Sequence, residues 1–415
     1  MRVLCCVSDY PTHYFPLIPL GWALQAAGHE LRVCAGPAQA ATIERAGLTP
    51  VPCGPDVDPV TDARWLAYSL ARQGLRTGQL PPLNPETGAE LADLDAFDHA
   101  EFAARRQQEL ARVGEARTRD VLDLAKSWRP DLVLHDLVAA EAVVAAQLSG
   151  VPSACHLWGL TGTSETTPGL DSLAADVPAP VRELIGMAAD EPAIRFVLDP
   201  TPPPIAPPTA APRMPVRYVP YNGPGALADP PPWPTEIGRA RVAVVWGSAI
   251  RRINGPGSFL VPALVDALAA RGVDVVLAIG AEEAELLGRL PANVQVLPQY
   301  PLRLLLPHCT AVVHHGGAGA ALTAAAAGLP QLVVAFGPME LRSAQRIADA
   351  GVGVALPGAH AAPGTIRAAV DQLLDTPELA AAAAEMARAN AALPSPADVV
   401  PVLEKLAETG EQMGG

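Results

Sequence analysis

The stretch "AVVHHGGAGAALTAAAAGLPQ", residues 311–331, combines residue types that can bind an anion. An apolar run ends at two histidines, a glycine-rich turn follows, and an alanine-rich run begins beyond the turn. A buried strand that passes through such a turn into a helix directs several backbone N–H groups, and the positive end of the helix dipole, at one point. Glycines let a diphosphate approach this backbone closely, and a histidine can donate a further hydrogen bond to a phosphate oxygen. The stretch therefore predicts a phosphate-binding turn.

A nicotinamide-binding turn is a competing interpretation of the same residues. That fingerprint needs the order G-x-G-x-x-G after a strand and an acidic residue about 20 positions further on. Here two histidines precede the order G-G-A-G at residues 316–319, and no such acid ends the next strand. The dinucleotide interpretation is therefore weaker than the phosphate-binding one. A plain tight turn with histidines in the core is a further alternative.

The elements that must position this turn belong to a repeated pattern of strands and helices. Near the N-terminus, "RVLCCV" (residues 2–7) has the continuous apolar run of a strand buried on both faces. A helix over residues 16–27, ended by Gly28, and a second strand over residues 29–35 complete a parallel crossover unit. Residues 200–234 contain too much proline for helices or central strands and so mark a domain boundary. After this boundary the pattern begins again.

The second half of the chain predicts another doubly wound sheet. We expect its helices over residues 259–271, 318–327, 340–350, 363–375 and 377–392. The expected fold class is α/β, with two Rossmann-like, doubly wound parallel-sheet domains that face a central cleft. The expected parts are a first domain over residues 1–218, a proline-rich linker over 219–235, a second domain over 236–395, and over 396–415 a C-terminal helix or tail that can pack back on the first domain.

Composition excludes several classes of partner. The 415 residues carry a formal net charge of −14, which disfavours a nucleic-acid partner because phosphate backbones require a basic surface. The N-terminus lacks the features of a signal peptide, and no run of about 18 uncharged apolar residues resembles a membrane helix, because glycine and proline interrupt the nearest match, "AGAALTAAAAGLPQLVVAFGP". The six cysteines lack metal-ligand spacing, and we interpret the D-x-D matches at residues 56–58 and 93–95 as chance. We therefore expect a cytoplasmic protein with no membrane, nucleic-acid or metal partner.

Residues 311–331 resemble the donor-binding motif of GT-B fold glycosyltransferases of family 1, whose antibiotic-decorating bacterial members carry HHGGAGT. At the N-terminus, "THYFPLIPLGWALQAAGHELRVC" resembles the family's G-H-x-x-P and the helix and strand that follow it. The resemblance covers essentially the whole chain and is strongest over residues 1–36 and 293–356. It implies a GT-B fold and an enzyme that moves a sugar by direct displacement at the anomeric carbon, with inversion. It implies no cofactor besides the nucleotide-diphosphate sugar, which is the donor substrate.

The resemblance assigns catalysis to His13 and Asp136. His13 falls on the family's catalytic base, in the loop after the first strand, where a base can meet an acceptor hydroxyl. Asp136 ends the strand "DLVLHD", where the family keeps the acid that orients the base. The alternatives are a surface histidine without a role and an aspartate that only caps the helix over residues 139–149.

The resemblance assigns the donor site to the second domain. Its residues are Gly247, Ser248, Arg251, Gln299, Tyr300, His315, Gly316, Gly317, Ala318, Gly319, Ala320, Met339 and Glu340. Three positions depart from the family's pattern: Ala320 replaces a threonine, Gln299 replaces a tryptophan, and Met339-Glu340 replaces an Asp-Gln pair. Since methionine accepts almost no hydrogen bond from a sugar hydroxyl, Met339 favours a deoxygenated or aminated sugar. The predicted donor is a TDP-deoxysugar, with UDP-glucose as the rival.

The acceptor site is expected in the cleft of the first domain, beside His13, built from residues 52–110 and from the loop 156–165. Its candidate residues are Tyr10, Tyr14, Phe15, Trp65, His156 and Trp158. Aromatic side chains beside a base favour a hydrophobic acceptor such as a macrolide, a polyketide or an aromatic natural product. Transfer to oxygen is the main prediction, and transfer to carbon stays open. The alternatives are a catalytically degenerate nucleotide-sugar-binding or auxiliary protein and a sugar-nucleotide epimerase; a homodimer or a helper protein also stays open.

Overall fold

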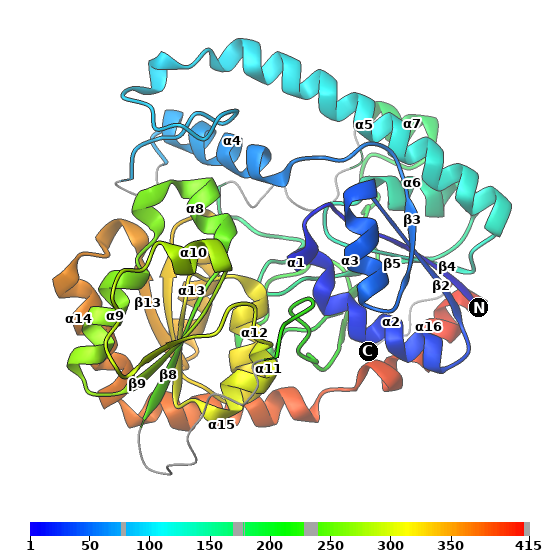
Figure 1. The fold of residues 1–415 in the computed structure, drawn as a ribbon. Coiled ribbons are helices and arrows are strands. Elements are labelled where there is room, and N and C mark those ends of the chain that lie inside the picture. The colour runs from blue at the N-terminus through cyan, green and yellow to red at the C-terminus, as the bar shows by residue number, and fades with distance from the viewer. Residues whose placement is uncertain (76–79, 169–176, 178, 228–239, 411–415) are drawn as a thin grey trace.

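The protein contains two parallel β-sheets, each covered by helices (Figure 1). The computed structural model describes residues 1–75, 80–168, 177, 179–227 and 240–410. Within these residues, one sheet has seven strands in the order β3-β2-β1-β4-β5-β6-β7, and the other has six in the order β10-β9-β8-β11-β12-β13. Neighbouring strands of both sheets pair in parallel. The predicted α/β class with two doubly wound sheets is confirmed.

The first sheet is built around β1, whose apolar sequence suits a strand covered on both faces. Val3, Leu4 and Cys5 of this strand are completely buried. The strands of this sheet are β1 (Arg2–Cys6), β2 (Glu30–Ala35), β3 (Thr49–Pro52), β4 (Leu132–His135), β5 (Ser153–His156), β6 (Val197–Asp199) and β7 (Arg213–Pro215). The helices of this half are α1 (Pro11–Tyr14), α2 (Ile18–Ala26), α3 (Ala40–Arg45), α4 (Pro59–Arg72), α5 (His99–Trp128), α6 (Ala140–Ser149) and α7 (Ala179–Leu184).

The second sheet is built around β8 and β11. Its strands are β8 (Arg241–Trp246), β9 (Asp274–Ile279), β10 (Val294–Val296), β11 (Ala311–His314), β12 (Gln331–Ala335) and β13 (Gly353–Pro357). The helices of this half are α8 (Ser248–Asn254), α9 (Val261–Ala270), α10 (Ala281–Glu285), α11 (Leu302–Leu305), α12 (Ala318–Ala327), α13 (Pro338–Asp349), α14 (Pro363–Asp375) and α15 (Pro377–Ala392). The helices α12, α14 and α15 have the boundaries predicted from the sequence, because glycine or proline marks their ends.

Both sheets reverse their strand order next to the first strand of the domain. The reversal lies between β1 and β4 in the first sheet and between β8 and β11 in the second. Doubly wound sheets bind ligands beyond the carboxyl ends of the strands at such a reversal. The loops that follow these strands carry His13, Asp136, Gly247 and His315. The topology therefore brings the candidate residues of each domain to the binding edge of its sheet.

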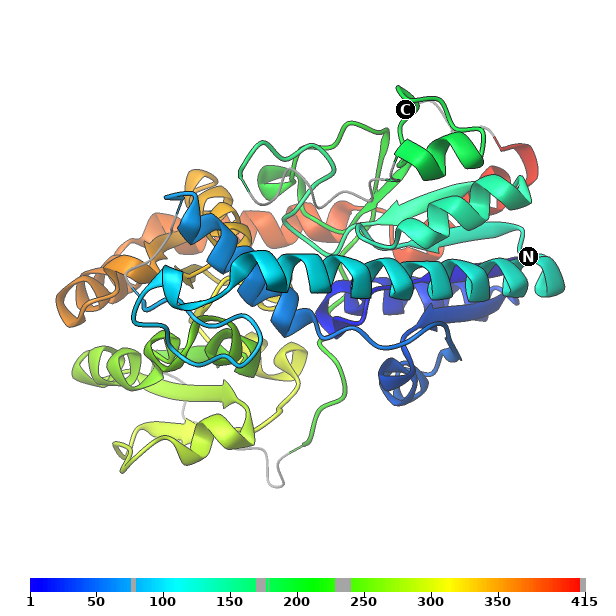
Figure 2. The same ribbon diagram turned by 90° about the horizontal axis from the view of Figure 1, so that it is seen from above.

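The residues between β3 and β4 leave the first sheet and reach the second domain. The helix α4 lies over α8, and the long helix α5 runs back over the first domain (Figures 1 and 2). The Arg64 Nε atom of α4 donates a hydrogen bond of 2.6 Å to the carbonyl oxygen of Arg252 in α8. Leu80, in the segment that follows α4, packs against the core of the second domain. This excursion closes one side of the space between the domains.

A last helix, α16 (Pro396–Thr409), returns from the second domain to the first (Figure 1). It packs against α2, and Val399, Leu403 and Leu406 are buried in the core of the first domain. The two halves of the molecule are therefore joined by more than the interdomain segment.

Two of the predicted boundaries fall partly outside the described residues. The predicted linker 219–235 is described up to residue 227, and the predicted tail 396–415 is described up to residue 410. In the described part of the chain, no helix combines the length and apolar character that crossing a membrane requires.

Candidate active site

His13 lies on the single turn α1 and faces the space between the domains. Its ring stacks on the Trp158 ring, with centroids 3.9 Å apart and planes inclined by 10°, and the Tyr10 ring lies 4.9 Å away. The Ser8 Oγ atom is 3.1 Å from the Nδ1 atom of His13. Burial lowers the pKa of His13 to about 4. The imidazole is therefore neutral at pH 7 and able to accept a proton.

Asp136, the predicted partner of His13, lies behind Ser8. Its carboxylate accepts hydrogen bonds from the backbone N–H of Ser8 at 2.6 Å and from that of Val138 at 3.0 Å. Among the described residues, no hydrogen bond joins Asp136 directly to His13. The negative charge of Asp136 raises the pKa of His13 and so opposes part of the effect of burial. Asp136 fixes the backbone that carries Ser8, and the Ser8 hydroxyl contacts the imidazole.

The glycine-rich turn after β11 is fixed by His314. The Nδ1 atom of His314 accepts a hydrogen bond of 3.0 Å from the Gly316 N–H, so its Nε2 atom carries the proton and donates to Gln331 Oε1 at 2.8 Å. Gly316 has a φ angle of 96°, and a Cβ atom on it would lie 2.7 Å from the Cβ atom of Glu340. Only glycine fits both constraints. The turn thereby brings the start of α13 close to the start of α12.

The start of α12 offers backbone donors to a ligand. Gly317 is its N-cap, and the Ala321 N–H donates to the Gly317 carbonyl at 3.1 Å. The N–H groups of Ala318, Gly319 and Ala320 come before this first helical hydrogen bond. They have no acceptor within the helix, and they point outward from its N-terminal end, where the helix dipole is positive. This arrangement suits the diphosphate that the sequence predicts.

His315 joins this turn to the turn after β8. Its Nε2 atom lies 3.1 Å from the position that a Cβ atom on Gly247 would take, and its ring meets the Trp246 ring edge-on at 5.9 Å. Burial lowers the pKa of His315 to about 3. A neutral imidazole can donate one N–H to a phosphate oxygen without adding charge. Ser248 follows Gly247 as the first residue of α8 and is exposed.

Three other residues predicted to bind the donor, Arg251, Gln299 and Tyr300, contact other parts of the protein. The guanidinium of Arg251 lies 3.6 Å from the carboxylate of Glu283, a residue that is 1% exposed. Gln299 is exposed and has a φ angle of 54°, and its carbonyl accepts a hydrogen bond of 3.0 Å from the Ala226 N–H. Tyr300 packs against the core of the second domain. The charge of Arg251 is therefore partly balanced, and Gln299 ties the interdomain segment to the second domain.

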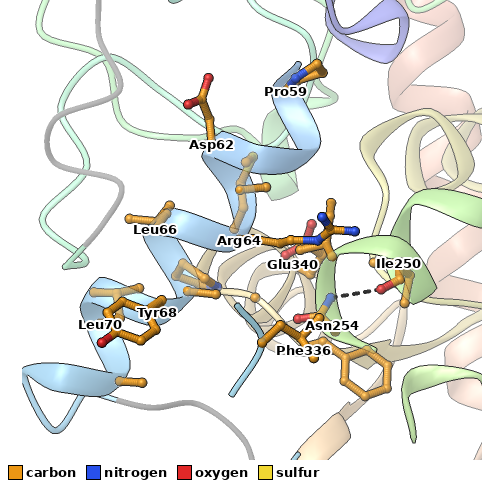
Figure 3. A pocket seen from close by; sticks show the side chains of 18 of the residues that line it. Pro59, Asp62, Arg64, Leu66, Tyr68, Leu70, Ile250, Asn254, Phe336 and Glu340 are labelled. Carbon is orange, nitrogen blue, oxygen red and sulfur yellow. Dashed lines mark hydrogen bonds between the residues drawn. The ribbon is translucent and has the colours of Figure 1, made fainter. Parts of the chain in front are cut away.

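A cavity of about 510 Å³ lies between the two domains (Figure 3). Tyr10 and His13 line it from the first domain, and Met339 and Glu340 line it from the start of α13. Most of the remaining wall is apolar and comes from α4, from the segment that follows α4, and from α8. Burial raises the pKa of Glu340, although the backbone groups of Gly337 and of Glu340 itself act in the opposite direction. A neutral imidazole and a carboxyl group with a raised pKa thus face one largely apolar space.

The six predicted acceptor residues take different positions relative to the cavity. Tyr10 lines the cavity, whereas the others do not. Those buried within the first domain are Tyr14, Phe15, His156 and Trp158. Trp65 packs against the rings of Tyr68 and Phe102. Of the buried set, Trp158 reaches the site through its stacking on His13.

Much of the cavity wall comes from α4, which lies within the predicted stretch 52–110. Its cavity-lining apolar residues are Ala63, Leu66, Ala67, Leu70 and Ala71. Their spacing of i, i+3, i+4, i+7 and i+8 places them on one face of a helix, and this pattern is the signal that identifies them. Ile250 and Asn254 of α8 line the same cavity from the second domain (Figure 3). The cavity is therefore built from both domains.

Two facing Rossmann-like domains with a cavity between them form the architecture of GT-B glycosyltransferases. The solved structure of the spinosyn rhamnosyltransferase SpnG matches with a TM-score of 0.76 and 30% sequence identity, covering 98% of this chain and 100% of that chain. SpnG has also been solved complexed with thymidine diphosphate and with spinosyn aglycone. Fold and site together define a glycosyltransferase of the GT-B class.

The chain belongs to the family of erythromycin biosynthesis protein CIII-like proteins. Models of the family's N-terminal and C-terminal domains match residues 22–247 and 262–406. The chain is 33% identical over 429 residues to 10-deoxymethynolide desosaminyltransferase of Streptomyces venezuelae, covering 98% of this chain and 97% of the relative. It is 34% identical over 423 residues to TDP-daunosamine transferase DnrS of Streptomyces peucetius, again covering 98% and 97%. The protein is therefore a glycosyltransferase related to those of natural-product biosynthesis.

Proposed function

We propose that this enzyme transfers a deoxysugar from a TDP-sugar to a hydroxyl group of a hydrophobic natural-product aglycone, with inversion at the anomeric carbon. The observation that carries the proposal is that His13 and Glu340, from different domains, line the same cavity of about 510 Å³. Its apolar wall suits a hydrophobic acceptor. The relatives support both substrate classes, because one is named for TDP-daunosamine and a similar structure has been solved with thymidine diphosphate and with an aglycone.

His13 is the base of the proposed reaction. When its Nδ1–H donates to Ser8 Oγ, the Nε2 atom keeps a free lone pair. The acceptor hydroxyl gives its proton to Nε2 while its oxygen forms the bond to the anomeric carbon. The bond between that carbon and the TDP oxygen breaks, and its electron pair leaves with the diphosphate. An α-linked donor therefore gives a β-glycoside.

The turn after β11 holds the leaving diphosphate in the proposed reaction. Negative charge grows on the diphosphate as the sugar leaves, and the N–H groups at the start of α12 already point toward that position. His315 adds a neutral N–H donor beside them. Because these donors belong to fixed backbone and buried side chains, they need little rearrangement during the reaction.

Met339 and Glu340 favour a sugar with fewer hydroxyls than glucose. The Met339 side chain is a poor partner for a hydroxyl group, and the wall around it is apolar. Glu340 is the carboxyl group that the second domain presents to the cavity, and it can pair with an amino group or with a remaining hydroxyl. A TDP-linked deoxysugar, with or without an amino group, fits these residues better than UDP-glucose does.

The test compares the wild type with His13→Ala. TDP at about 100 times its dissociation constant should stabilise both proteins by roughly 2.7 kcal/mol in thermal unfolding, since His13 lies in the other domain. UDP should stabilise them less, and NAD not at all. Transfer, measured as TDP release from a panel of TDP-deoxysugars with polyketide aglycones, should fall by about 10²–10⁴-fold in the variant. Transfer that persists in His13→Ala overturns the assignment of the base, and stabilisation by NAD alone overturns the donor class.

A further inference from the structure

The loop after β5, residues 157–165, belongs to the first domain in sequence but docks on the second. The Leu157 N–H still donates to the Leu198 carbonyl at 2.9 Å, which ends the pairing of the first sheet. Leu160 is 1% exposed and packs in a core cluster shared with α12, β12 and α13. Gly159 has a φ angle of 152°, and a Cβ atom on it would lie 2.7 Å from the Cβ atom of Ala318, the first residue of α12. The backbone of this loop therefore lies directly against the start of the donor-binding helix.

A buried ion pair fastens this loop to α13. Both carboxylate oxygens of Glu165 lie 2.9 Å from the Nη2 atom of Arg346. Arg346 also donates to the carbonyl of Leu160 through Nη1, and Glu165 accepts a hydrogen bond of 3.0 Å from the Gly162 N–H. The side chains of Glu165 and Arg346 are 1% and 11% exposed. A pair so buried and so well bonded holds its geometry tightly, because losing one partner leaves an uncompensated charge in the interior.

The same loop carries the ring that covers His13. Trp158 lies one residue before Gly159, and it stacks on the imidazole at 3.9 Å with planes inclined by 10°. Contacts therefore run without a break from Arg346 through Glu165 and the loop to Trp158 and His13. The helix that holds Arg346 also presents Glu340 to the cavity from its first turn. One helix of the second domain thus contacts the cavity directly and, through the loop, the imidazole of the first domain.

We infer that Glu165 and Arg346 form a positioning pair across the two domains, which fixes the Trp158 ring on His13 and so sets the place and the hydration of the base relative to the donor. This inference rests on the proposed role of His13 as the base. When the pair is broken, the loop loses its attachment to α13, and the Trp158 ring no longer shields the imidazole from water. The base then lies less accurately against the anomeric carbon.

Hydration of His13 has a measurable signature. Burial holds its pKa at about 4, below the usual 6.5, and Asp136 is the charged group that acts on it; Asp62, Arg64 and Glu340 line the same cavity. The other neighbours of His13 are Ser8 and Tyr10, and burial keeps Tyr10 neutral by raising its pKa to about 12. Water that enters beside the imidazole therefore moves the pKa of His13 up, toward the usual histidine value. A change in general stability alone does not produce this shift.

The experiment follows the His13 imidazole by NMR in histidine-labelled, TDP-saturated protein, with the signal assigned by its loss in His13→Ala. In Glu165→Gln the pKa of His13 should rise by roughly one unit or more. The affinity for TDP should stay within about 2-fold, because the backbone donors at α12 are unchanged. Arg271→Gln, which removes an exposed ion pair of Arg271 with Asp371 and Asp375 in the second domain, serves as the control and should leave the pKa of His13 where it is. An unchanged His13 pKa in Glu165→Gln overturns the inference.

Two further variants keep the test decisive. Arg346→Lys retains the charge but loses the planar fork, so it should shift the His13 pKa in the same direction even where Glu165→Gln folds poorly. Trp158→Phe should raise the pKa by itself, and adding Glu165→Gln should then add little, because both changes act through one contact. If the His13 pKa shift of the double variant equals the sum of the two single shifts, Glu165 does not act on His13 through Trp158. A failure of the catalytic proposal is seen separately, as transfer that survives in His13→Ala whatever the pKa of the imidazole.

Discussion

At the scale of single residues, we expect the reactivity of His13 to depend on the Ser8 hydroxyl group that contacts its imidazole. The only hydrogen bond of the imidazole within the described residues is the 3.1 Å contact between Nδ1 and Ser8 Oγ. Ser8→Ala removes this partner but keeps the backbone N–H that binds Asp136, so the loop itself is retained. We expect kcat to fall by about 10-fold with little change in the KM of the donor, because the imidazole loses its preferred tautomer and orientation. Steady-state kinetics check this, and an unchanged kcat contradicts the role of Ser8.

Glu340 gives a second prediction at this scale, about the choice of sugar. Glu340→Gln keeps the shape of the side chain and removes the charge that an amino group would pair with. We expect transfer from an amino-substituted TDP-deoxysugar to fall by roughly 10- to 100-fold, the value of a hydrogen bond to a charged group. Transfer from the TDP-deoxysugar without the amino group should change by less than about 3-fold. Competition between the two donors measures the ratio, and an equal loss on both contradicts a role in recognising the amino group.

Some site residues were predictable from sequence and others were not. His13 and the turn at residues 315–320 stand at strand ends in a recognisable motif, so their place beside the cleft follows from the pattern. Ser8 has no such signal, because a sequence does not say which small side chain will meet the imidazole. Tyr14 follows His13 directly, yet the turn of α1 directs it into the core, where its hydroxyl donates to Gln39 Oε1 at 3.0 Å. Neighbours in sequence point to different sides of a helical turn.

At the scale of elements, we expect α4 to decide which acceptors fit. Its inner face lines the cavity with Leu66 and Leu70, whereas Leu75, just beyond the helix, is 43% exposed. Leu66→Ala should raise the KM of the acceptor by about 10- to 100-fold through lost apolar contact, with the affinity for TDP unchanged. Leu75→Ala is the matched control and should leave the KM of the acceptor as it is. A similar effect of both variants would mean that α4 acts through stability and not through contact with the acceptor.

Long elements with clear ends were predicted better than short ones. The helices α12, α14 and α15 begin and end at proline or glycine, and their predicted and observed boundaries agree. The strands β6 and β7 have only three residues each, and β7 lies in the proline-rich region that we interpreted as a boundary. Proline is tolerated there because β7 is the edge strand of its sheet. Three residues carry too little periodicity to be recognised, and their place in the sheet depends on partners far away in the chain.

At the scale of the whole molecule, buried histidines make stability depend on pH. His156 is 1% exposed, and burial lowers its pKa to about 4, below the 6.5 of an unfolded chain. As the pH falls, the unfolded chain therefore takes up a proton on His156 before the folded protein does. This histidine does not weaken folding above about pH 6.5, and it lowers the free energy of unfolding progressively as the pH falls from 6.5 toward 4. In His156→Gln the free energy of unfolding should depend less steeply on pH in this window, by about 1.4 kcal/mol per pH unit.

Chemical unfolding at pH 7, 6 and 5 measures this difference. Asp199, whose pKa burial raises to about 6, acts in the opposite sense, so the comparison of wild type and variant isolates the histidine. Parallel pH profiles for the two proteins contradict the prediction.

Contacts across the whole molecule were the least predictable. The local pattern gave two parallel-sheet domains, but nothing in it shows that Arg346 meets Glu165 or that Arg64 meets the carbonyl of Arg252. Each of these contacts joins residues more than a hundred positions apart, and each depends on how the domains face one another. The wall of the cavity depends on the same arrangement, which explains why the sequence pattern brought His13 and the turn at residues 315–320 to the edges of their sheets but did not show which aromatic residues line the cavity.

The return of α16 to the first domain means that one core is assembled from two distant stretches of the chain. The core around α2 includes Val399, Leu403 and Leu406, which follow the whole of the second domain in sequence. The strands and helices of the second domain, by contrast, all lie between β8 and α15. A chain cut before residue 396 therefore keeps every strand and helix of the second domain, whereas the half that holds His13 loses part of the apolar cover of α2.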